Sequence, residues 1–128
     1  MDIINDMLIM IKNGSRAGHE SVVFPYSKLK HAIALCLERE GYVGAVSKKV
    51  KKNVPSIEVG LLYNGEKPRV SEVKRLSKPS RRVYQSVKDM RPTRQGTGTI
   101  VYSTPKGIMT DKQARKEHVG GEALFSIW

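Results

Sequence analysis

The amino-acid sequence predicts an α+β protein of two small lobes: an N-terminal α-β-α-β-β unit and a C-terminal, mainly β unit with one short helix. Two observations predict this. Long apolar patterns with helical spacing occur in the first half of the chain, whereas the second half consists of short β-branched runs separated by turn residues. The length of 128 residues is enough for two small lobes with modest cores. We therefore expect lobes at residues 1–66 and 67–128.

The first predicted element is a helix that begins near Ile3. Apolar residues recur at helical spacing as far as Ile11, and Asn13-Gly14 is the expected stop signal. The helix is apolar over much of its circumference, which is more typical of a core helix than of a membrane-surface helix. A short strand is expected over Val22-Val23-Phe24, and Pro25 is expected to end it.

A second helix is predicted from Lys28 to about Glu40. Ser27 is a typical N-cap, and Gly41 is a typical C-terminal stop. Its buried stripe is expected at four positions of helical spacing: Leu29, Ile33, Cys36 and Leu37. Cys36 lies between two leucines, so we expect a small core residue rather than a nucleophile.

Two strands are expected to complete the first lobe, from Tyr42 to Val50 and from Ser56 to Tyr63. The tip between them is crowded with four lysines, which are Lys48, Lys49, Lys51 and Lys52. Asn64-Gly65 is a turn signal close to the expected boundary between the lobes.

The second lobe is predicted to contain short strands and one helix. Val70, Val73 and Leu76 favour a strand but leave a helix open, and Arg82-Val83-Tyr84 favours a strand. The remaining elements are a strand from Thr97 to Tyr102, a helix after Thr110 with a capping box to Gln113, and a last strand from Ala123 to Trp128.

Charge is the strongest functional signal of the chain. Lysine and arginine number 23 against 12 acidic residues, which gives a net charge of +11. Residues 65–128 contain 14 of the basic and 6 of the acidic residues, so the excess lies mainly in the second lobe. Such a field attracts polyanions, above all nucleic acid. A membrane surface is the alternative, but no apolar run approaches the roughly 20 residues of a spanning helix, and we expect no signal peptide.

The cysteine and histidine residues argue against a cofactor or a metal. Cys36 is the single cysteine and can form no intrachain disulfide, which fits a reducing compartment. His19, His31 and His118 lack the spacing of metal ligands. We therefore expect no cofactor, no metal ion and no small-molecule substrate.

The segment from Gly96 to Asp111 gathers residue types that bind RNA. Ser103-Thr104-Pro105-Lys106-Gly107 is expected to be a loop between a strand and the capped helix, because Pro105 restricts its own φ and Gly107 permits a turn. The loop would place two hydroxyls, a lysine and the first amides after Thr110 at one rim, where they could bind phosphates, ribose hydroxyls or base edges. An ordinary turn followed by a helix cap would use the same residues, so the loop alone does not distinguish an RNA-binding site from a structural turn.

A basic segment from Lys74 to Arg94 adds capacity for phosphate binding. It contains eight basic residues and one acidic residue, Asp89, in 21 positions. This excess favours phosphate contact over an ordinary solvated surface. The basic residues are Lys74, Arg75, Lys78, Arg81, Arg82, Lys88, Arg91 and Arg94.

Three residues near this segment have two interpretations each. Tyr84 could stack on an irregular base, or it could be a half-buried aromatic residue of a strand. Gly121 could let the backbone approach RNA closely, or it could simply turn the chain. Glu122 would be repelled by phosphate, so we expect a structural role or a contact with a base amino group.

The order of the motifs resembles one known family. The run from Ser103 to Asp111, followed by Ala114-Arg115 and Gly120-Gly121-Glu122, is similar to the C-terminal signature of the eighth protein of the small ribosomal subunit, in its bacterial and organellar form. Further matching motifs cover essentially the whole chain: Asn5-Asp6-Met7-Leu8, Ile11-Lys12-Asn13-Gly14, Ser27-Lys28-Leu29-Lys30, Glu40-Gly41-Tyr42, Arg75, Ser77, Pro79 and Arg82-Val83-Tyr84.

The resemblance implies a two-lobed fold and a structural, non-enzymatic role in the small ribosomal subunit. It implies a primary rRNA-binding protein whose second lobe contacts the central domain of the small-subunit rRNA early in assembly, beside neighbouring ribosomal proteins. Some bacterial members also repress their own operon messenger. The implied location is the bacterial cytoplasm, or an organellar matrix or stroma. The residues expected to bind RNA are Ser103, Thr104, Pro105, Lys106, Gly107, Thr110, Arg82, Tyr84, Arg75, Lys78, Arg81, Gly121 and Glu122.

Two features depart from the family pattern. Position 105 is proline where the family often has serine, and the hairpin with Lys48 to Lys52 is more basic than expected, which suggests extra backbone contact. The alternative function is a basic RNA- or DNA-binding regulator without a ribosomal role. The helix from Lys28 to Glu40 is too acidic at its end for a DNA recognition helix. An enzyme is disfavoured because Ser103 lacks a nucleophile elbow and the loop is not a Walker loop.

Overall fold

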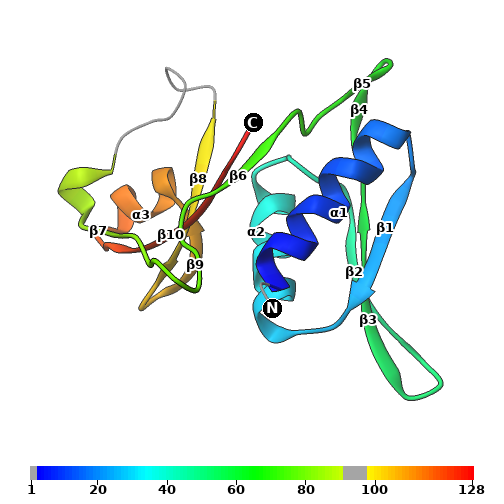
Figure 1. The fold of residues 1–128 in the computed structure, drawn as a ribbon, viewed down its shortest axis with the longest axis horizontal. Helices are drawn as coiled ribbons and strands as arrows, with labels where there is room; N and C mark the ends of the chain where they lie inside the picture. Colours follow the sequence, from blue (N-terminus) through cyan, green and yellow to red (C-terminus); the bar gives the residue numbers. More distant parts are fainter. Residues whose placement is uncertain (1–2, 91–97) are drawn as a thin grey trace. The chain divides into compact units, whose positions relative to one another are not determined.

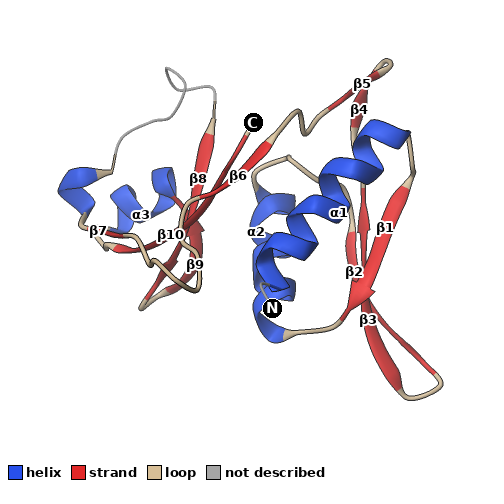
Figure 2. Ribbon diagram, in the orientation of Figure 1, coloured by secondary structure: helices blue, strands red, loops and turns tan. Residues whose placement is uncertain are grey.

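The computed structural model describes residues 3–90 and 98–128. The chain divides into two compact units, Ile3–Ser71 and Glu72–Trp128, whereas the sequence places the boundary after Glu66. The fold class is α+β, as predicted, with helices and antiparallel sheets in both units (Figure 2). The predicted strand start at Thr97 and the cations Arg91 and Arg94 lie outside the described residues.

The first unit packs two helices against a three-stranded antiparallel sheet of order β1-β3-β2 (Figure 1). One face of this sheet forms the core, because Ile57 and Val59 are fully buried while Val23 on the other face is exposed. The elements are α1 (Ile3–Ala17), β1 (Ser21–Pro25), α2 (Lys28–Arg39), β2 (Val46–Lys51), β3 (Val54–Gly60), β4 (Tyr63–Asn64) and β5 (Lys67–Pro68).

Helix α1 is longer than predicted. It does not stop at Asn13-Gly14 but continues to Ala17, and Gly18 follows with a φ of +78°. Gly14 is buried inside the helix, where a Cβ would lie 2.7 Å from Cγ1 of Val22. This glycine therefore allows close packing of helix on strand and does not mark a turn.

Helix α2 begins where the sequence predicts. The Ser27 hydroxyl accepts a hydrogen bond from the Lys30 amide at 3.0 Å, which confirms the N-cap. Gly41 follows the helix with a φ of +78°, as expected for a C-terminal stop.

The buried stripe of α2 differs from the prediction at one position. Ile33, Cys36 and Leu37 are buried, but Leu29 is exposed and its neighbour Lys30 is buried instead. The Lys30 amine lies 5.6 Å from the centre of the Phe24 ring, a cation–π contact that offsets part of the cost of burial. Burial raises the pKa of the Cys36 thiol to about 11, so this core residue is a neutral thiol at neutral pH.

The hairpin of β2 and β3 contains the predicted lysine tip. β2 begins at Val46 rather than at Tyr42, because Tyr42 and Val43 form a bend and the two residues after them belong to no strand. The two strands pair as far as Lys51 and Val54, so Lys52 and Asn53 form the turn, with φ values of 51° and 64°. Two successive positive φ angles are typical of a two-residue hairpin turn.

The second unit is a five-stranded antiparallel sheet, and α3 packs against its strand β8. The long strand β10 is central, because it pairs with β8 on one side and with β6 and β7 on the other. The elements are β6 (Val73–Arg75), β7 (Tyr84–Gln85), a 3-10 turn (Val87–Asp89), β8 (Thr99–Thr104), β9 (Gly107–Thr110), α3 (Asp111–Glu117) and β10 (Gly121–Ile127).

Strand β9 is the one element of the second sheet that the sequence does not predict. Ser103 and Thr104 are the last residues of β8 and not part of a loop. Pro105 and Lys106 form a tight turn, and β9 returns antiparallel from Gly107, which pairs with Thr104. Only four residues separate this turn from α3, and a strand so short shows no detectable alternation.

The other strands of the second unit are close to their predicted positions. Of the two structures left open around Val73, the strand is the one that forms, as β6. Of the strand expected at Arg82-Val83-Tyr84, only Tyr84 belongs to β7. β10 begins at Gly121, ahead of the predicted start at Ala123.

The packing of Gly14 generates a stability prediction. Overpacking costs about 1–3 kcal/mol, while alanine gains about 1 kcal/mol over glycine in a helix, so we expect Gly14→Ala to lower the free energy of unfolding by about 1 kcal/mol. Asn13→Ala is the matched control, because Asn13 is exposed on the same helix and alanine there should be neutral or slightly stabilising. Denaturant unfolding of both variants measures the effect. A more stable Gly14→Ala protein would show that the contact with Val22 relaxes freely.

Candidate nucleic-acid interface

Strand β10 brings β7 and β8 together at one end of the second sheet. Glu122 of β10 pairs with Tyr84 of β7 on one side and with Ser103 of β8 on the other. Directly paired residues of antiparallel strands carry their side chains on the same face. Tyr84, Glu122 and Ser103 therefore form one row across three strands, which we call the cross-strand row.

Two glycines allow this close arrangement. A Cβ on Gly121 would overlap the carbonyl oxygen of Ser103, and a Cβ on Gly120 would lie 2.6 Å from the carbonyl oxygen of Gln85. Both neighbours are backbone atoms, which cannot turn aside as a side chain can. Gly121 thus has a structural reason to be glycine, and this reason does not require a ligand.

The sequence predicts that Ser103 and Thr104 lie at one rim, but the structure separates their side chains. They are successive residues of β8, so their side chains point to opposite faces. The Thr104 hydroxyl donates to the Gly107 carbonyl at 2.8 Å and accepts from the Lys106 amide at 3.1 Å, which closes the hairpin turn. The Ser103 side chain is half-buried, and its hydroxyl has no hydrogen-bond partner within the described residues. Of the two hydroxyls, that of Ser103 is therefore available to a ligand.

Tyr84 is exposed to solvent at the end of the cross-strand row. Its relative exposure is 71 %, the highest of the large hydrophobic side chains in the described residues. This excludes the alternative of a half-buried strand aromatic. Both the face of the ring and its hydroxyl are accessible, as stacking on a base requires.

Arg82 and Glu122 form an ion pair beside the row. The Arg82 Nη1 atom lies 3.1 Å from Oε2 of Glu122. The Glu122 side chain is 13 % exposed and the Arg82 side chain 55 %, so the acid is largely covered while the arginine still faces solvent. Arg82 is thus fixed to the sheet, and its remaining N–H groups can donate outward.

Two of the exposed cations of the basic segment, Lys78 and Arg81, lie on a tight turn. Lys78 and Arg81 exchange backbone hydrogen bonds of 2.8 and 3.0 Å, and both side chains are exposed. Neither has a carboxylate partner in the part of the chain that the structure describes. The Ser77 hydroxyl accepts from the Val83 amide at 2.8 Å and holds the base of this turn. Lys78 and Arg81 are therefore free to meet phosphate, as are the exposed Lys74 and Lys88 of the same segment.

Arg75 differs from these two residues. Its Nη1 atom donates to the Leu124 carbonyl at 2.6 Å, so part of its guanidinium serves the fold. Lys106 at the tip of the β8–β9 hairpin is exposed, with Glu117 at 3.7 Å. Pro105 and Gly107 beside it are exposed as well.

Side chains of the protein itself occupy the N-terminus of α3, where the sequence predicts phosphate binding. The Thr110 hydroxyl, 1 % exposed, accepts from the Gln113 amide at 3.2 Å and caps the helix as predicted. The buried carboxylate of Asp111 accepts from the Ile100 amide at 3.3 Å and from Arg115 at 3.1 Å. An anion at the helix start would meet this carboxylate, so the predicted phosphate binding by these amides finds no support.

Sequence reasoning missed a contact beneath the row. The buried Tyr102 hydroxyl of β8 donates to the side-chain oxygen of Gln85 in β7. Burial, followed by the nearby charge of Asp111, raises the pKa of Tyr102 to about 12, so the hydroxyl stays a neutral donor. No local pattern could have paired these residues, because they are distant in sequence and meet only in the folded sheet.

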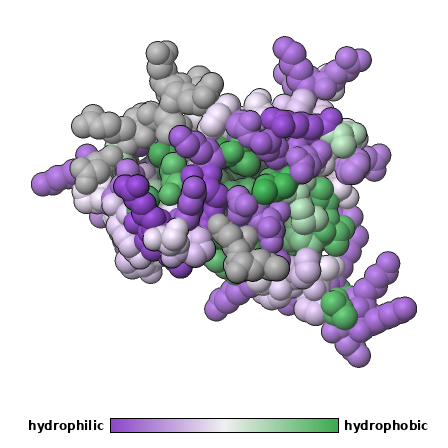
Figure 3. Space-filling model, in the orientation of Figure 1, coloured by the Kyte–Doolittle hydropathy of each residue, from purple (hydrophilic) through white to green (hydrophobic). Residues whose placement is uncertain are grey.

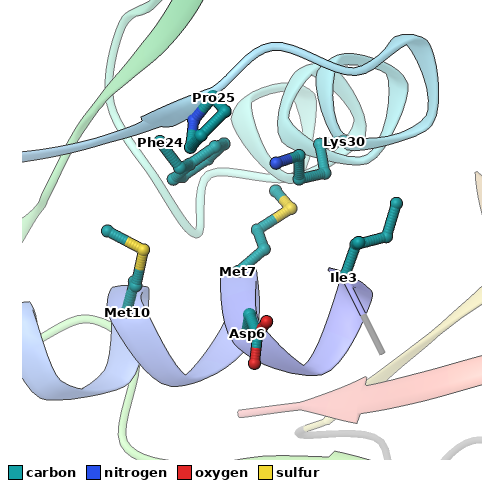
Figure 4. Close-up of a pocket in the computed structure, with 7 residues that line it drawn as sticks. All are labelled: Ile3, Asp6, Met7, Met10, Phe24, Pro25 and Lys30. Atoms are coloured by element: carbon teal, nitrogen blue, oxygen red, sulfur yellow. The ribbon is translucent and has the colours of Figure 1, made fainter. Parts of the chain in front are cut away.

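The first unit has a pocket of different chemistry (Figure 4). The side chains of Met7 and Met10 point from α1 toward Phe24 and Pro25 of β1, and the amine of Lys30 points into the same space. None of the residues predicted to bind RNA lines it. The lining residues are Ile3, Asp6, Met7, Met10, Phe24, Pro25 and Lys30.

Comparison with known proteins agrees with the resemblance. The family model described as Ribosomal protein S8 matches residues 2–128. The chain belongs to the ribosomal protein S8 family. Three proteins named small ribosomal subunit protein uS8 are each 42 % identical to it, from Mycoplasmopsis agalactiae over 127 residues, from a Ruegeria species over 128 and from an Azoarcus species over 126. The alignments cover 99, 99 and 98 % of this chain and 97, 98 and 96 % of those relatives.

Membership of this family gives the general role of the protein. It is a structural protein of the small ribosomal subunit and not an enzyme. No described helix is long and apolar enough to cross a membrane. Within residues 3–90 and 98–128, no group of histidine, cysteine and acidic side chains is arranged to hold a metal ion.

The unequal roles of Ser103 and Thr104 generate a prediction. Thr104→Val removes both hydrogen bonds of the turn, so we expect the free energy of unfolding to fall by about 1 kcal/mol. Ser103→Ala removes no bond within the described residues and should leave stability within about 0.5 kcal/mol of the parent. Thermal and denaturant unfolding of the two single variants measure the difference. Equal effects would show that the hydroxyl of Thr104 does not hold the turn.

Proposed function

We propose that the chain is a primary rRNA-binding protein, which binds the central domain of the small-subunit rRNA through its second unit and helps to nucleate subunit assembly. The cross-strand row carries this proposal. It combines the exposed aromatic ring of Tyr84 with the Ser103 hydroxyl, which has no hydrogen-bond partner among the described residues, on one sheet. Membership of a family of small-subunit ribosomal proteins supports rRNA as the ligand.

The geometry suits the minor groove of A-form RNA. That groove is wide and shallow and exposes ribose hydroxyls and base edges, whereas the major groove is too deep and narrow for side chains. A short hydroxyl on a strand, such as that of Ser103, can reach a shallow surface without a long flexible side chain. Because the sheet already holds Ser103, little conformational entropy is lost on binding.

The cations around the row provide affinity rather than selection. Lys78 and Arg81 on their turn and Lys106 on the β8–β9 hairpin are exposed and positively charged. Contacts of such residues with phosphates fix the register of a protein on RNA but do not read its sequence. We assign these three residues to phosphate binding.

Glu122 needs the ion pair to take part in an RNA site. A lone carboxylate would repel the phosphates, but Arg82 balances its charge at 3.1 Å. The second carboxylate oxygen can then accept a hydrogen bond from a base amino group. In the proposed complex, Arg82 faces the phosphate backbone of the RNA, and Glu122 faces a base.

The same surface would bind any RNA stem of the same shape. We therefore extend the proposal to repression of the chain's own operon messenger, through a stem that mimics the rRNA site. Neighbouring small-subunit proteins would be its other partners. The proposed location is the ribosome of the bacterial cytoplasm, or of an organelle.

Ser103→Ala tests the row directly. One lost hydrogen bond costs about 1 kcal/mol, so affinity for an RNA stem from the central domain should fall about fivefold. Ser47→Ala is the matched control, because Ser47 is an exposed strand serine of the first unit. Filter binding of both variants to the stem and to unrelated duplex RNA measures the effect. The proposal would be wrong if Ser103→Ala bound the stem as tightly as the parent does.

The Arg82–Glu122 pair predicts non-additive changes. Arg82→Ala should weaken binding to cognate and unrelated RNA alike by about tenfold, because it removes a phosphate contact and leaves Glu122 uncompensated. Adding Glu122→Gln to Arg82→Ala removes the repulsion and should restore affinity for unrelated RNA in part. A double-mutant cycle in the binding assay measures the coupling. Purely additive effects would show that Glu122 does not act through Arg82.

A further inference from the structure

The hairpin of β2 and β3 extends beyond the sheet of the first unit. The last residue of β1, Pro25, pairs with Ser56, whereas β2 and β3 continue to pair as far as Lys51 and Val54. The Tyr26 amide, just after β1, still donates to the Pro55 carbonyl at 3.2 Å, and beyond this bond residues 50–54 form a two-stranded ribbon without a third strand. Figure 1 shows this hairpin projecting away from the helices of its unit. Such an isolated ribbon is only marginally stable by itself.

Two of the four lysines are held by neighbouring side chains. The Lys48 amine lies 4.1 Å from the centre of the Tyr26 ring. The Lys49 amine lies 2.6 Å from Oε1 of Glu58, and this contact lowers the pKa of that carboxyl. Both contacts lie at the base of the ribbon, where the third strand ends.

The two lysines at the tip have no such contacts. Lys51 and Lys52 are exposed, and neither has an ion pair or hydrogen bond of its side chain within residues 3–90 and 98–128. Lys52 lies in the turn itself, with a φ of 51°. The tip therefore presents two free positive charges at the far end of a protruding arm.

The ribbon also exposes two valines. Val50 is 64 % exposed and Val54 62 %, which among large hydrophobic side chains of the described residues is exceeded only by Tyr84. They lie on opposite faces, because Val54 pairs with Lys51, the residue after Val50. At the position of the hairpin, Figure 3 shows a hydrophobic side chain surrounded by long hydrophilic ones. A partner that buried both valines would have to contact both faces of the ribbon.

Edge protection is the simpler explanation for some of the lysines. β2 is an edge strand, and lysines on an edge prevent pairing with another chain. This accounts for Lys48, Lys49 and Lys51. It accounts neither for Lys52, which lies in the turn, nor for the exposed valines on both faces.

We propose that the tip of the β2–β3 hairpin is a second RNA-binding site, separate from the cross-strand row. Lys51 and Lys52 bind phosphates, and Val50 and Val54 pack on the apolar faces of riboses as the ribbon enters a groove. The inference rests on the proposed function, because the RNA is the same rRNA. Charge favours RNA over a protein partner, since the tip offers two free cations and no acid.

The experiment compares two RNA probes and two matched variants. The probes are a minimal stem that contains the site of the cross-strand row and a transcript of the entire central domain of the small-subunit rRNA. Lys52→Glu reverses one charge at the tip. Lys67→Glu is the control, because Lys67 is an exposed lysine in the other hairpin of the same unit. Both substitutions keep a charged side chain on the surface, and thermal unfolding checks that both variants fold.

The proposal predicts a loss that depends on the probe. Lys52→Glu should bind the entire domain at least fivefold more weakly than the parent, with a log–log salt slope less negative by about 0.9, and should bind the minimal stem unchanged. Lys67→Glu should match the parent on both probes. Parental affinity of Lys52→Glu for the entire domain, or an equal loss on both probes, would overturn the second site.

Failure of the proposed function would look different. In that case the parent itself would not bind the minimal stem above its affinity for unrelated duplex RNA. A parent that binds the stem, together with an unaffected Lys52→Glu variant, refutes the hairpin site alone.

Discussion

The missing side chain at Gly121 is the constraint on which the candidate interface depends. It lets β10 approach β8 so closely that a Cβ would overlap the carbonyl of Ser103, while Gly120 does the same toward β7. This approach sets the register that places Glu122 between Tyr84 and Ser103. The chemistry of the row thus follows from a packing requirement. The structural and functional interpretations of Gly121 are linked, because the packing of this glycine also shapes the surface beside it.

Local signals in the sequence were sufficient wherever structure is decided within a few residues. The N-caps at Ser27 and Thr110 follow from hydroxyl-to-amide bonds that span three positions, and both were predicted. Gly14 shows the opposite case. A glycine in a helical pattern can end the helix or permit close packing. Gly14 has the second role because Val22 packs against it, and this contact is visible only in the folded structure. Strand β9 escaped prediction because a short strand is defined by its partner, β8, more than by its own composition.

The sequence could predict which residues belong to the candidate site, but not which of them hold the fold and which are available to a ligand. The sequence placed Tyr84, Glu122 and Ser103 in one proposed site, and the three residues are neighbours in the sheet. It treated the hydroxyls of Ser103 and Thr104 as equivalent, however. A strand separates them, because successive side chains point to opposite faces. Likewise, charge counting could not show that Arg82 is paired and that Arg75 donates to a carbonyl, since both partners lie about forty residues or more away in sequence.

The burial of Cys36 has a practical consequence for spectroscopy. Its thiol is the single one in the chain, is 1 % exposed and has a pKa of about 11, so thiol-directed dyes should not react with it in the folded protein. A cysteine introduced at an exposed position, such as Asn53 in the hairpin turn, would then be the sole reactive group. The natural protein therefore needs no cysteine replacement before site-specific fluorescent labelling. Each unit can be given its own reporter dye in turn, while the core around Cys36 stays intact.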